Sequence, residues 1–197
     1  MARFIRSGMA DSPIIEATNA DDFVLAGPQD NVVRAKGGND FVFGEDGFDT
    51  LYGGRGNDSL FGGNDDDILY GGNGNDFLYG ENGNDSLFGG DGHDTLIGGE
   101  GADTLTGGSG KDIFYFGTLP DNSTDFDTIT DFQPGADKIQ VEGVEFFNGI
   151  DDRSLARFIY NGVTGELSFD AGAGFLTKFA QLQTNLNFVA SRDISIV

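Results

Sequence analysis

A large apolar side chain recurs at every ninth residue through the middle of the chain, with glycine and polar residues between. The period holds without a gap for nine units between residues 35 and 115. Each apolar residue is the centre of a short stretch that predicts a three-residue strand with that side chain pointing inward. One such unit buries almost no surface, so the repeat predicts a solenoid whose core forms by stacking. The inward residues are Val42, Leu51, Leu60, Leu69, Leu78, Leu87, Leu96, Leu105 and Phe114.

Glycine-rich turns connect the predicted strands. Glycine tolerates positive φ, so each turn can fold back and bring its carbonyl oxygens near one point. Two units then form one coil of 18 residues, with a strand on each side. Equivalent strands of successive coils would stack about 4.8 Å apart, the ordinary spacing of paired strands. The pattern therefore predicts an all-β fold, a parallel β-roll.

An aspartate lies two residues before each inward side chain, at the end of the glycine-rich turn. Two weaker units precede the nine in register, with Asp22 and Asn31 at the aspartate position. Calcium binds about six to eight oxygen atoms, which carboxylates and backbone carbonyls both supply. The repeat therefore predicts a stacked array of sites for a hard cation. The nine aspartates are Asp40, Asp49, Asp58, Asp67, Asp76, Asp85, Asp94, Asp103 and Asp112.

The units at residues 53–61 and 71–79 are the cleanest, and both begin Gly-Gly-x-Gly-Asn-Asp. They resemble the nonapeptides of the repeats-in-toxin (RTX) family, which build a calcium-loaded parallel β-roll. The resemblance implies that each ion lies between one turn and the turn two units later. The first turn would supply its aspartate and the carbonyls of positions two and four. The second would supply its aspartate and the carbonyls of positions one and three, which implies about seven Ca²⁺ sites in all.

Carried onto this sequence residue by residue, the resemblance implies metal ligands in every turn. One ion would contact Gly54, Gly56, Asp58, Gly71, Asn73 and Asp76. The implied ligands in full are Lys36, Gly38, Asp40, Glu45, Gly47, Asp49, Gly53, Gly54, Arg55, Gly56, Asp58, Gly62, Gly63, Asn64, Asp65, Asp67, Gly71, Gly72, Asn73, Gly74, Asp76, Gly80, Glu81, Asn82, Gly83, Asp85, Gly89, Gly90, Asp91, Gly92, Asp94, Gly98, Glu100, Asp103, Gly107, Ser109 and Asp112.

Some turns depart from the usual glycine pattern. Lys36, Glu45 and Glu81 stand at position two, where only a carbonyl is required. Asp65 replaces the glycine of position four, and aspartate enters the left-handed backbone region more readily than most residues. We expect the site that starts at Lys36 to be the least secure. The alternative is a glycine-rich solenoid without metal, in which the stacked carboxylates would repel one another strongly.

The charge balance agrees with bound cations. The chain has 33 acidic and 11 basic residues, a formal net charge of −22. Such an acidic, glycine-rich chain would stay disordered unless something offset its charge. Seven calcium ions would leave a net charge of about −8. Nucleic acid and anionic membranes are poor partners for this surface, and no stretch has the length of a membrane span.

The chain divides by pattern into three segments: residues 1–34 with two degenerate repeats, the roll at 35–115, and a β-rich cap at 116–197. The segment around Asp127, Asp131 and Asp137 looks like the one that follows the repeats in serralysins and alginate epimerases. We expect cap strands at 156–160, 166–169, 175–182 and 192–197. Asn161-Gly162 is a hairpin signal between the first two of these strands.

No enzyme signal stands out. The sequence has no zinc-binding HExxH helix and no cysteine, which removes metalloprotease and thiol chemistry. His93, the single histidine, fits a solvated turn residue better than a catalytic base. Asp125 and Asp127 could suggest acid–base work, but two carboxylates in an aspartate-rich segment carry little information. We therefore predict a protein that is not an enzyme.

Two functional classes remain. The first is a calcium-driven folding and export module. The absence of a signal peptide alone suggests a cytosolic protein, but the RTX resemblance implies secretion from a Gram-negative cell through a type I apparatus. Residues 193–197 resemble an acidic-then-apolar export signal, and a final edge strand is the equal alternative. The second class is a self-standing extracellular protein that binds surface polysaccharide, matrix or an adhesive layer.

An outward row of apolar residues bears on the second class. We name it the aromatic strip, and monomers seldom leave a strip of this size exposed. We expect the later cap strands, the N-terminal segment or a second copy of the chain to cover it. If the aromatic strip is exposed, it would instead favour a polysaccharide-binding surface. The aromatic strip comprises Phe41, Phe43, Phe61, Phe77, Tyr79, Ile97, Ile113 and Tyr115.

Overall fold

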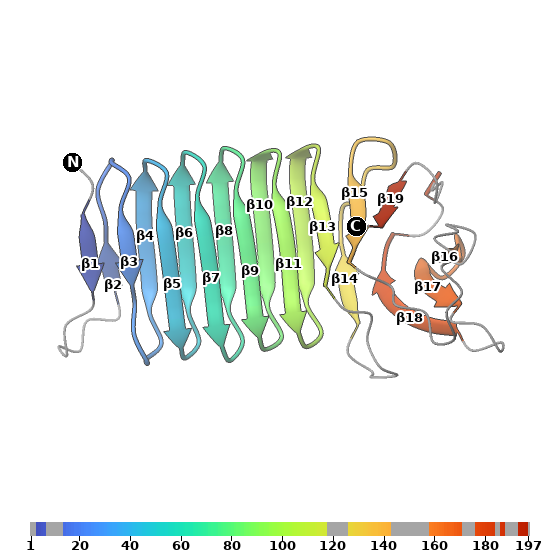
Figure 1. Cartoon of the computed structure of the whole chain (residues 1–197), viewed down its shortest axis with the longest axis horizontal. Coiled ribbons are helices and arrows are strands. Elements are labelled where there is room, and N and C mark those ends of the chain that lie inside the picture. Colours follow the sequence, from blue (N-terminus) through green and yellow to red (C-terminus); the bar gives the residue numbers. More distant parts are fainter. Residues whose placement is uncertain are drawn as a thin grey trace.

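A computed structural model describes residues 3–6, 14–117, 126–142, 158–170, 176–183, 186–187 and 193–196. Its strands alternate between two long sheets and form an elongated row of coils (Figure 1). In spatial order, the first sheet contains β1 (Phe4–Arg6), β3 (Phe23–Leu25), β5 (Phe41–Asp46), β7 (Ser59–Asn64), β9 (Phe77–Asn82), β11 (Thr95–Glu100), β13 (Ile113–Phe116), β15 (Lys138–Val141) and β19 (Ile194–Ile196).

The second sheet continues past the roll into the C-terminal segment. In spatial order, it contains β16 (Phe158–Tyr160), β17 (Glu166–Asp170), β18 (Leu176–Gln181), β14 (Asp127–Ile129), β12 (Thr104–Gly110), β10 (Ser86–Gly92), β8 (Ile68–Asn73), β6 (Thr50–Arg55), β4 (Val32–Gly37) and β2 (Ile14–Glu16).

Strand pairing in the roll follows the repeat. Leu60 pairs with Leu78, and Leu51 pairs with Leu69, in parallel register. The parallel β-roll with one coil per two nonapeptides is therefore confirmed. The strands are longer than the predicted three residues, because the ladder continues into the glycine turn, where Gly54 pairs with Gly72.

The core is a single stack of inward side chains. Leu69, Leu78 and Leu87 are fully buried, at 0% exposure. The stack extends beyond the nine units to Val24 on one side and Ile139 on the other. Burying one leucine contributes about 1.5–3 kcal/mol, so each coil adds to the core only because its neighbours cover it.

Both ends continue the sheets. β3 pairs with β5 and β4 pairs with β6, so the two weaker N-terminal units are members of the solenoid, and β2 adds a strand beyond β4. At the other end, β14 extends the second sheet and β15 extends the first. β19 then pairs with β15, and β18 pairs with β14. All four expected cap strands are present; β16, β18 and β19 are shorter than predicted, and β17 is one residue longer.

The hairpin between β16 and β17 differs from the predicted Asn-Gly turn. The left-handed residue is Gly165, at φ +77°, while no positive φ occurs at Gly162. Asn161 instead accepts hydrogen bonds at Oδ1 from the backbone N–H groups of Val163 and Thr164, at 3.0 and 3.3 Å. The asparagine side chain thus shapes a wider turn that needs its glycine at the end.

The aromatic strip runs along the first sheet. Phe61 stacks on Phe43 with ring centroids 4.6 Å apart and contacts Phe77 at 5.8 Å. Phe41 is 50% exposed, whereas Phe61 and Tyr79 are partly buried. The described strands of the N-terminal segment and the cap extend the sheets instead of covering this face. Cover by a second copy stays a prediction. In the described residues we find no helix of sufficient length and apolarity to cross a membrane.

Candidate metal centre

The repeated aspartates form two buried ladders, one along each edge of the roll. Each carboxylate accepts a hydrogen bond at Oδ1 from the backbone N–H of the residue 18 positions earlier, which is Asn31 for Asp49 and an aspartate for the other eight. In this way Asp76 binds the N–H of Asp58 at 2.8 Å, and Asp94 binds the N–H of Asp76 at 2.8 Å. The nine aspartates are at most 3% exposed. The ladder fixes the direction of every carboxylate.

The second oxygen of each carboxylate lacks such a partner. Among the described residues, Oδ2 of all nine aspartates is buried without a hydrogen bond. Leaving a buried charged oxygen unpaired is destabilising by several kcal/mol. Because the same oxygen is unpaired in all nine aspartates, we infer that each of them has a positively charged partner of the same kind.

Six of the nine orphaned oxygens face a carbonyl across a glycine. A methyl group placed on Gly53 would lie 2.5 Å from Oδ2 of Asp58 and 2.7 Å from the carbonyl oxygen of Gly71. We call this arrangement a cradle: a glycine, the Oδ2 five residues later and the carbonyl oxygen 18 residues later. The glycines that begin complete cradles are Gly44, Gly53, Gly62, Gly71, Gly80 and Gly89.

The cradle geometry fits calcium. Its oxygens come from a carboxylate and from backbone carbonyls, the donor set that calcium prefers. The described residues contain no cluster of three or more acidic or histidine side chains that could hold a metal. A cation at these positions would therefore take most of its ligands from the turn backbone.

Comparison with known proteins agrees with this geometry. The family model for the RTX calcium-binding nonapeptide repeat (4 copies) matches residues 16–51, 43–78, 52–87, 61–96 and 88–118. Together these matches span more than half of the chain.

The chain belongs to the RTX calcium-binding repeat family.

One solved structure similar to this RTX chain is the solution structure of the AlgE6R3 subunit from the Azotobacter vinelandii mannuronan C5-epimerase. The two share 28% sequence identity, with 72% of this chain and 78% of that chain covered, at a TM-score of 0.35. Comparison with curated proteins gave no match.

The unusual residues of the RTX turns keep the turn shape. Lys36, Glu45, Asp65 and Glu81 have positive φ, between 78° and 82°. This region costs about 1–2 kcal/mol for a residue with a side chain. The glycines at equivalent positions have positive φ as well, so the backbone carbonyls keep their directions. Each departure noted in the sequence is thus accommodated at a local cost.

The first expected site has a different lining. Asp40 has an orphaned Oδ2 like the others, but residue 35 is a buried alanine where the complete cradles have glycine. That the site starting at Lys36 is the least secure stays a prediction.

Two members of the ladders were missed by the sequence analysis. Oδ1 of Asp127 accepts from the N–H of Asp103 at 3.2 Å, and Oδ1 of Asp137 accepts from the N–H of Asp112 at 3.1 Å. These pairs are 24 and 25 residues apart, so insertions hide them from the nine-residue period. An aspartate two residues before a buried apolar residue was the available signal. Asp121 also falls in the nine-residue register, nine residues after Asp112, and it lies outside the described residues.

Burial dominates the protonation of the metal-free ladders. It raises the pKa of Asp76 to about 7 and that of Asp127 to about 8. The backbone hydrogen bond opposes this shift at Asp76, and the neighbouring carboxylates add to it. The same rise to about 7 affects Asp49, Asp67 and Asp85. A bound cation would favour the ionised form instead.

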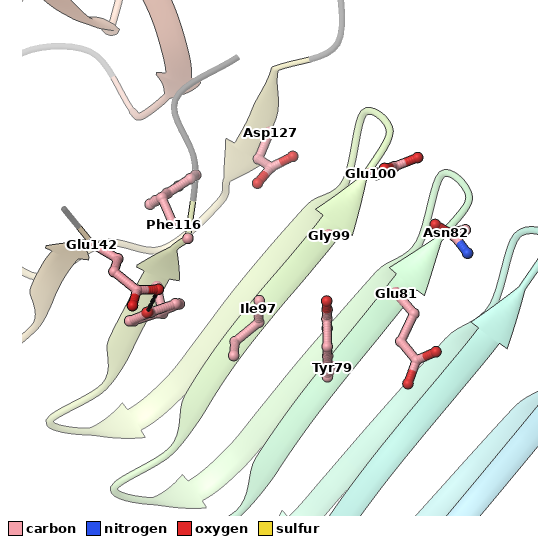
Figure 2. Close-up of a pocket in the computed structure, with 11 residues that line it drawn as sticks. Tyr79, Glu81, Asn82, Ile97, Gly99, Glu100, Phe116, Asp127 and Glu142 are labelled. Atoms are coloured by element: carbon pink, nitrogen blue, oxygen red, sulfur yellow. Dashed lines mark hydrogen bonds between the residues drawn. The ribbon is translucent and has the colours of Figure 1, made fainter. Parts of the chain in front are cut away.

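A separate acidic hollow lies where the roll meets the cap. It has a volume of about 550 Å³, and Figure 2 shows Tyr79, Glu81, Glu100 and Glu142 in its lining. The hydroxyl of Tyr115 donates to Glu142 at 2.5 Å, which raises the pKa of the phenol. Its lining contains none of the cradle residues, but it does contain Asp127 of the ladders and three of the implied ligands, Glu81, Asn82 and Glu100.

Proposed function

We propose that this RTX chain is a calcium-driven folding module that folds after type I secretion into a calcium-rich exterior. The observation that carries the proposal is the row of nine buried Oδ2 atoms, six of which face a backbone carbonyl across a glycine. The residues fit a calcium ion, which would supply two positive charges per site. We further propose that the domains divide as the sequence pattern suggests, at residues 34 and 115.

The ligands follow from the cradles. Asp58 would hold an ion through Oδ2, with the carbonyl of Gly71 on the opposite side. The remaining ligands would be the carbonyl oxygens of positions two and four in the first turn. The second turn would add the carbonyl oxygen of position three and its aspartate. The complete cradles support six such sites, and the Asp40 turn would add a seventh if Ala35 is tolerated.

Calcium concentration would then act as the trigger. Extracellular calcium modules bind at about 10⁻⁴–10⁻³ M, well above cytosolic levels. Without calcium, stacked carboxylates oppose folding, and the chain would leave the cell unfolded. At a hundredfold excess over the dissociation constant, each ion would stabilise the fold by about 2.7 kcal/mol. Several ions together would exceed a typical folding free energy of about 5–15 kcal/mol.

A structural and non-catalytic role accompanies this proposal. Asp127, the described member of the acid–base pair considered above, is held in a ladder by its hydrogen bond from Asp103. The tail at β19 is an edge strand on β15, and it would also serve as the export signal before folding.

Circular dichroism during a calcium titration tests the folding proposal. We expect a coil spectrum in excess chelator and a cooperative change to β-structure as calcium rises toward millimolar levels. A β-rich spectrum that persists in excess chelator would contradict it. Secretion is tested separately, by co-expression with a type I apparatus and by deletion of residues 193–197.

The aromatic strip favours a second candidate, attachment to a neutral polysaccharide. Phe41 is 50% exposed, and it belongs to the same outward row as the partly buried Phe43 and Phe61, whose rings stack on each other. Phe41→Ser should weaken polysaccharide binding of the calcium-loaded protein. Val163→Ser changes an 82% exposed residue elsewhere and is the control. If the wild type binds no polysaccharide in a glycan screen, this candidate is rejected.

A further inference from the structure

The turn that ends at Asn31 has the ladder geometry without the orphaned oxygen. The N–H of Asn31 donates to Oδ1 of Asp49 at 2.7 Å, as the ladder aspartates do, and the residue is 4% exposed. The backbone N–H of the ladder is therefore placed as in the central turns. The turn itself differs at position four, where Gln29 lacks the positive φ of the central turns and donates its N–H to the carbonyl oxygen of Gly27 at 2.9 Å.

The amide of Asn31 reaches the carbonyls that an ion would use. Nδ2 donates to the carbonyl oxygen of Gly27 at 3.3 Å and to that of Gln29. These residues are positions two and four of the turn, the positions that hold calcium in RTX repeats. Ala26, which is 1% exposed, stands where the complete cradles have glycine. An N–H donor thus takes the place of a cation.

In the preceding turn, both carboxylate oxygens of Asp22 also have hydrogen-bond donors from the protein. Oδ2 of Asp22 accepts from Thr18, at 2.8 Å from the backbone N–H and 2.6 Å from the hydroxyl. Its Oδ1 accepts from the N–H of Arg3 at 2.8 Å. The ammonium group of Lys36 donates to the carbonyl oxygen of Ala17 at 2.9 Å. Unlike the nine central aspartates, Asp22 has no orphaned oxygen.

The other end of the array carries a counterpart. Nε2 of Gln133 donates to the carbonyl oxygen of Gly108 at 3.1 Å, and Gly108 is position two of the last nonapeptide. Asp131 accepts from the N–H groups of Gly107 and Gly108 at 2.9 and 2.7 Å. Side chains from outside the nine units therefore bind the last turn, as Asn31 binds its own.

We propose that side-chain amides terminate the calcium array, Asn31 at the N-terminal end and Gln133 at the C-terminal end. The number of bound ions is then set by these residues and not by the number of units that the period can fit. The proposal rests on calcium binding in the central cradles. It also explains how both end coils stack on calcium-loaded neighbours without ions of their own.

Counting bound calcium by native mass spectrometry tests the proposal. The double variant Ala26→Gly/Asn31→Asp restores a complete cradle and a carboxylate at the N-terminal end. We expect it to bind one more calcium ion per chain than the wild type. Ala26→Gly alone keeps the amide and should bind the wild-type number. Asn57→Asp adds the same charge in an exposed turn and should also leave the number unchanged.

The outcomes separate this proposal from the proposed function. A wild type that binds no calcium rejects the function itself. A wild type that binds calcium, with no gain in the double variant or a gain in Ala26→Gly alone, overturns the role of the amide. If the double variant does not fold, hydrogen exchange of the Asn31 side-chain amide in calcium-loaded wild type decides. Slow exchange supports the proposal, and exchange at the rate of a solvated amide overturns it.

Discussion

At the scale of single residues, the cradle at Gly71 depends on the absence of a side chain, because a methyl group would fill the space between its oxygen atoms. A methyl group there would lie 2.5 Å from Oδ2 of Asp76 and 2.6 Å from the carbonyl of Gly89. Gly71→Ala should therefore remove one bound calcium and lower the melting temperature of the loaded protein. The count comes from native mass spectrometry and the melting temperature from calorimetry.

Gly37 offers the matched control. It also lies in a glycine-rich turn, at the end of β4. A methyl group there would lie 3.6 Å from its nearest atom, which is an ordinary contact distance. Gly37→Ala should keep the calcium count. Equal losses in both variants would show that the cradle glycines act through the backbone and not through ion access.

The raised pKa values predict opposite pH responses with and without calcium. Burial raises the pKa of Asp67 and Asp85 from 3.8 to about 7, so the metal-free folded chain binds more protons than the unfolded chain between these values. Its stability is therefore greatest at low pH and is lost as pH rises toward 7. In chelator, β-structure should increase as pH falls from about 7.5 to about 5.5.

Calcium binding should weaken over the same change in pH, because the ligand carboxylates must be deprotonated. We expect the calcium midpoint in circular dichroism to rise about tenfold or more between about pH 7.5 and 5.5. A midpoint that does not depend on pH would mean that these carboxylates do not bind the ion.

At the scale of elements, the hairpin between β16 and β17 depends on Gly165. An alanine there would have to adopt φ +77°, and its methyl group would lie 2.1 Å from the carbonyl oxygen of Leu182. Gly165→Ala should destabilise the cap by more than about 1 kcal/mol. Gly162→Ala, where the nearest atom is 3.7 Å away, should change stability by less than about 0.5 kcal/mol.

Hydrogen exchange of β16, β17 and β18 in calcium-loaded protein provides the local readout. Only Gly165→Ala should speed exchange there, and both variants should keep the protection of the central roll. If only Gly162→Ala speeds exchange, the result would contradict the role of Gly165 and support the Asn-Gly turn that the sequence predicted.

At the scale of the whole molecule, coordination and charge neutralisation make different predictions. Magnesium carries the same charge as calcium but demands octahedral ligands at about 2.0–2.1 Å and gives up water reluctantly. The cradles offer carbonyls fixed by the turn backbone, which suit the larger ion. At equal millimolar concentrations, magnesium should therefore leave the chain largely unfolded by circular dichroism. Full folding in magnesium would show that neutralising the net charge of −22 is sufficient.

The sequence alone determined the roll and the nine central aspartates. A strict period forces equivalent residues into equivalent places, so Leu69 and Asp67 define the core and the ladder without further information. Glycine at the start of each turn indicated where the carbonyls converge. These inferences rest on local geometry repeated many times, which a linear pattern records.

Tertiary structure decided what happens where the period breaks. Insertions take Asp127 and Asp137 out of the nine-residue period, and the register of β14 and β15 places them in the ladders. Asn31 stands at the aspartate position of a degenerate repeat, yet its side-chain amide donates hydrogen bonds to the carbonyls of its own turn. The cap strands extend the sheets because the last coils offer unpaired strand edges. Such pairings depend on distances between residues far apart in the chain, which no local pattern contains.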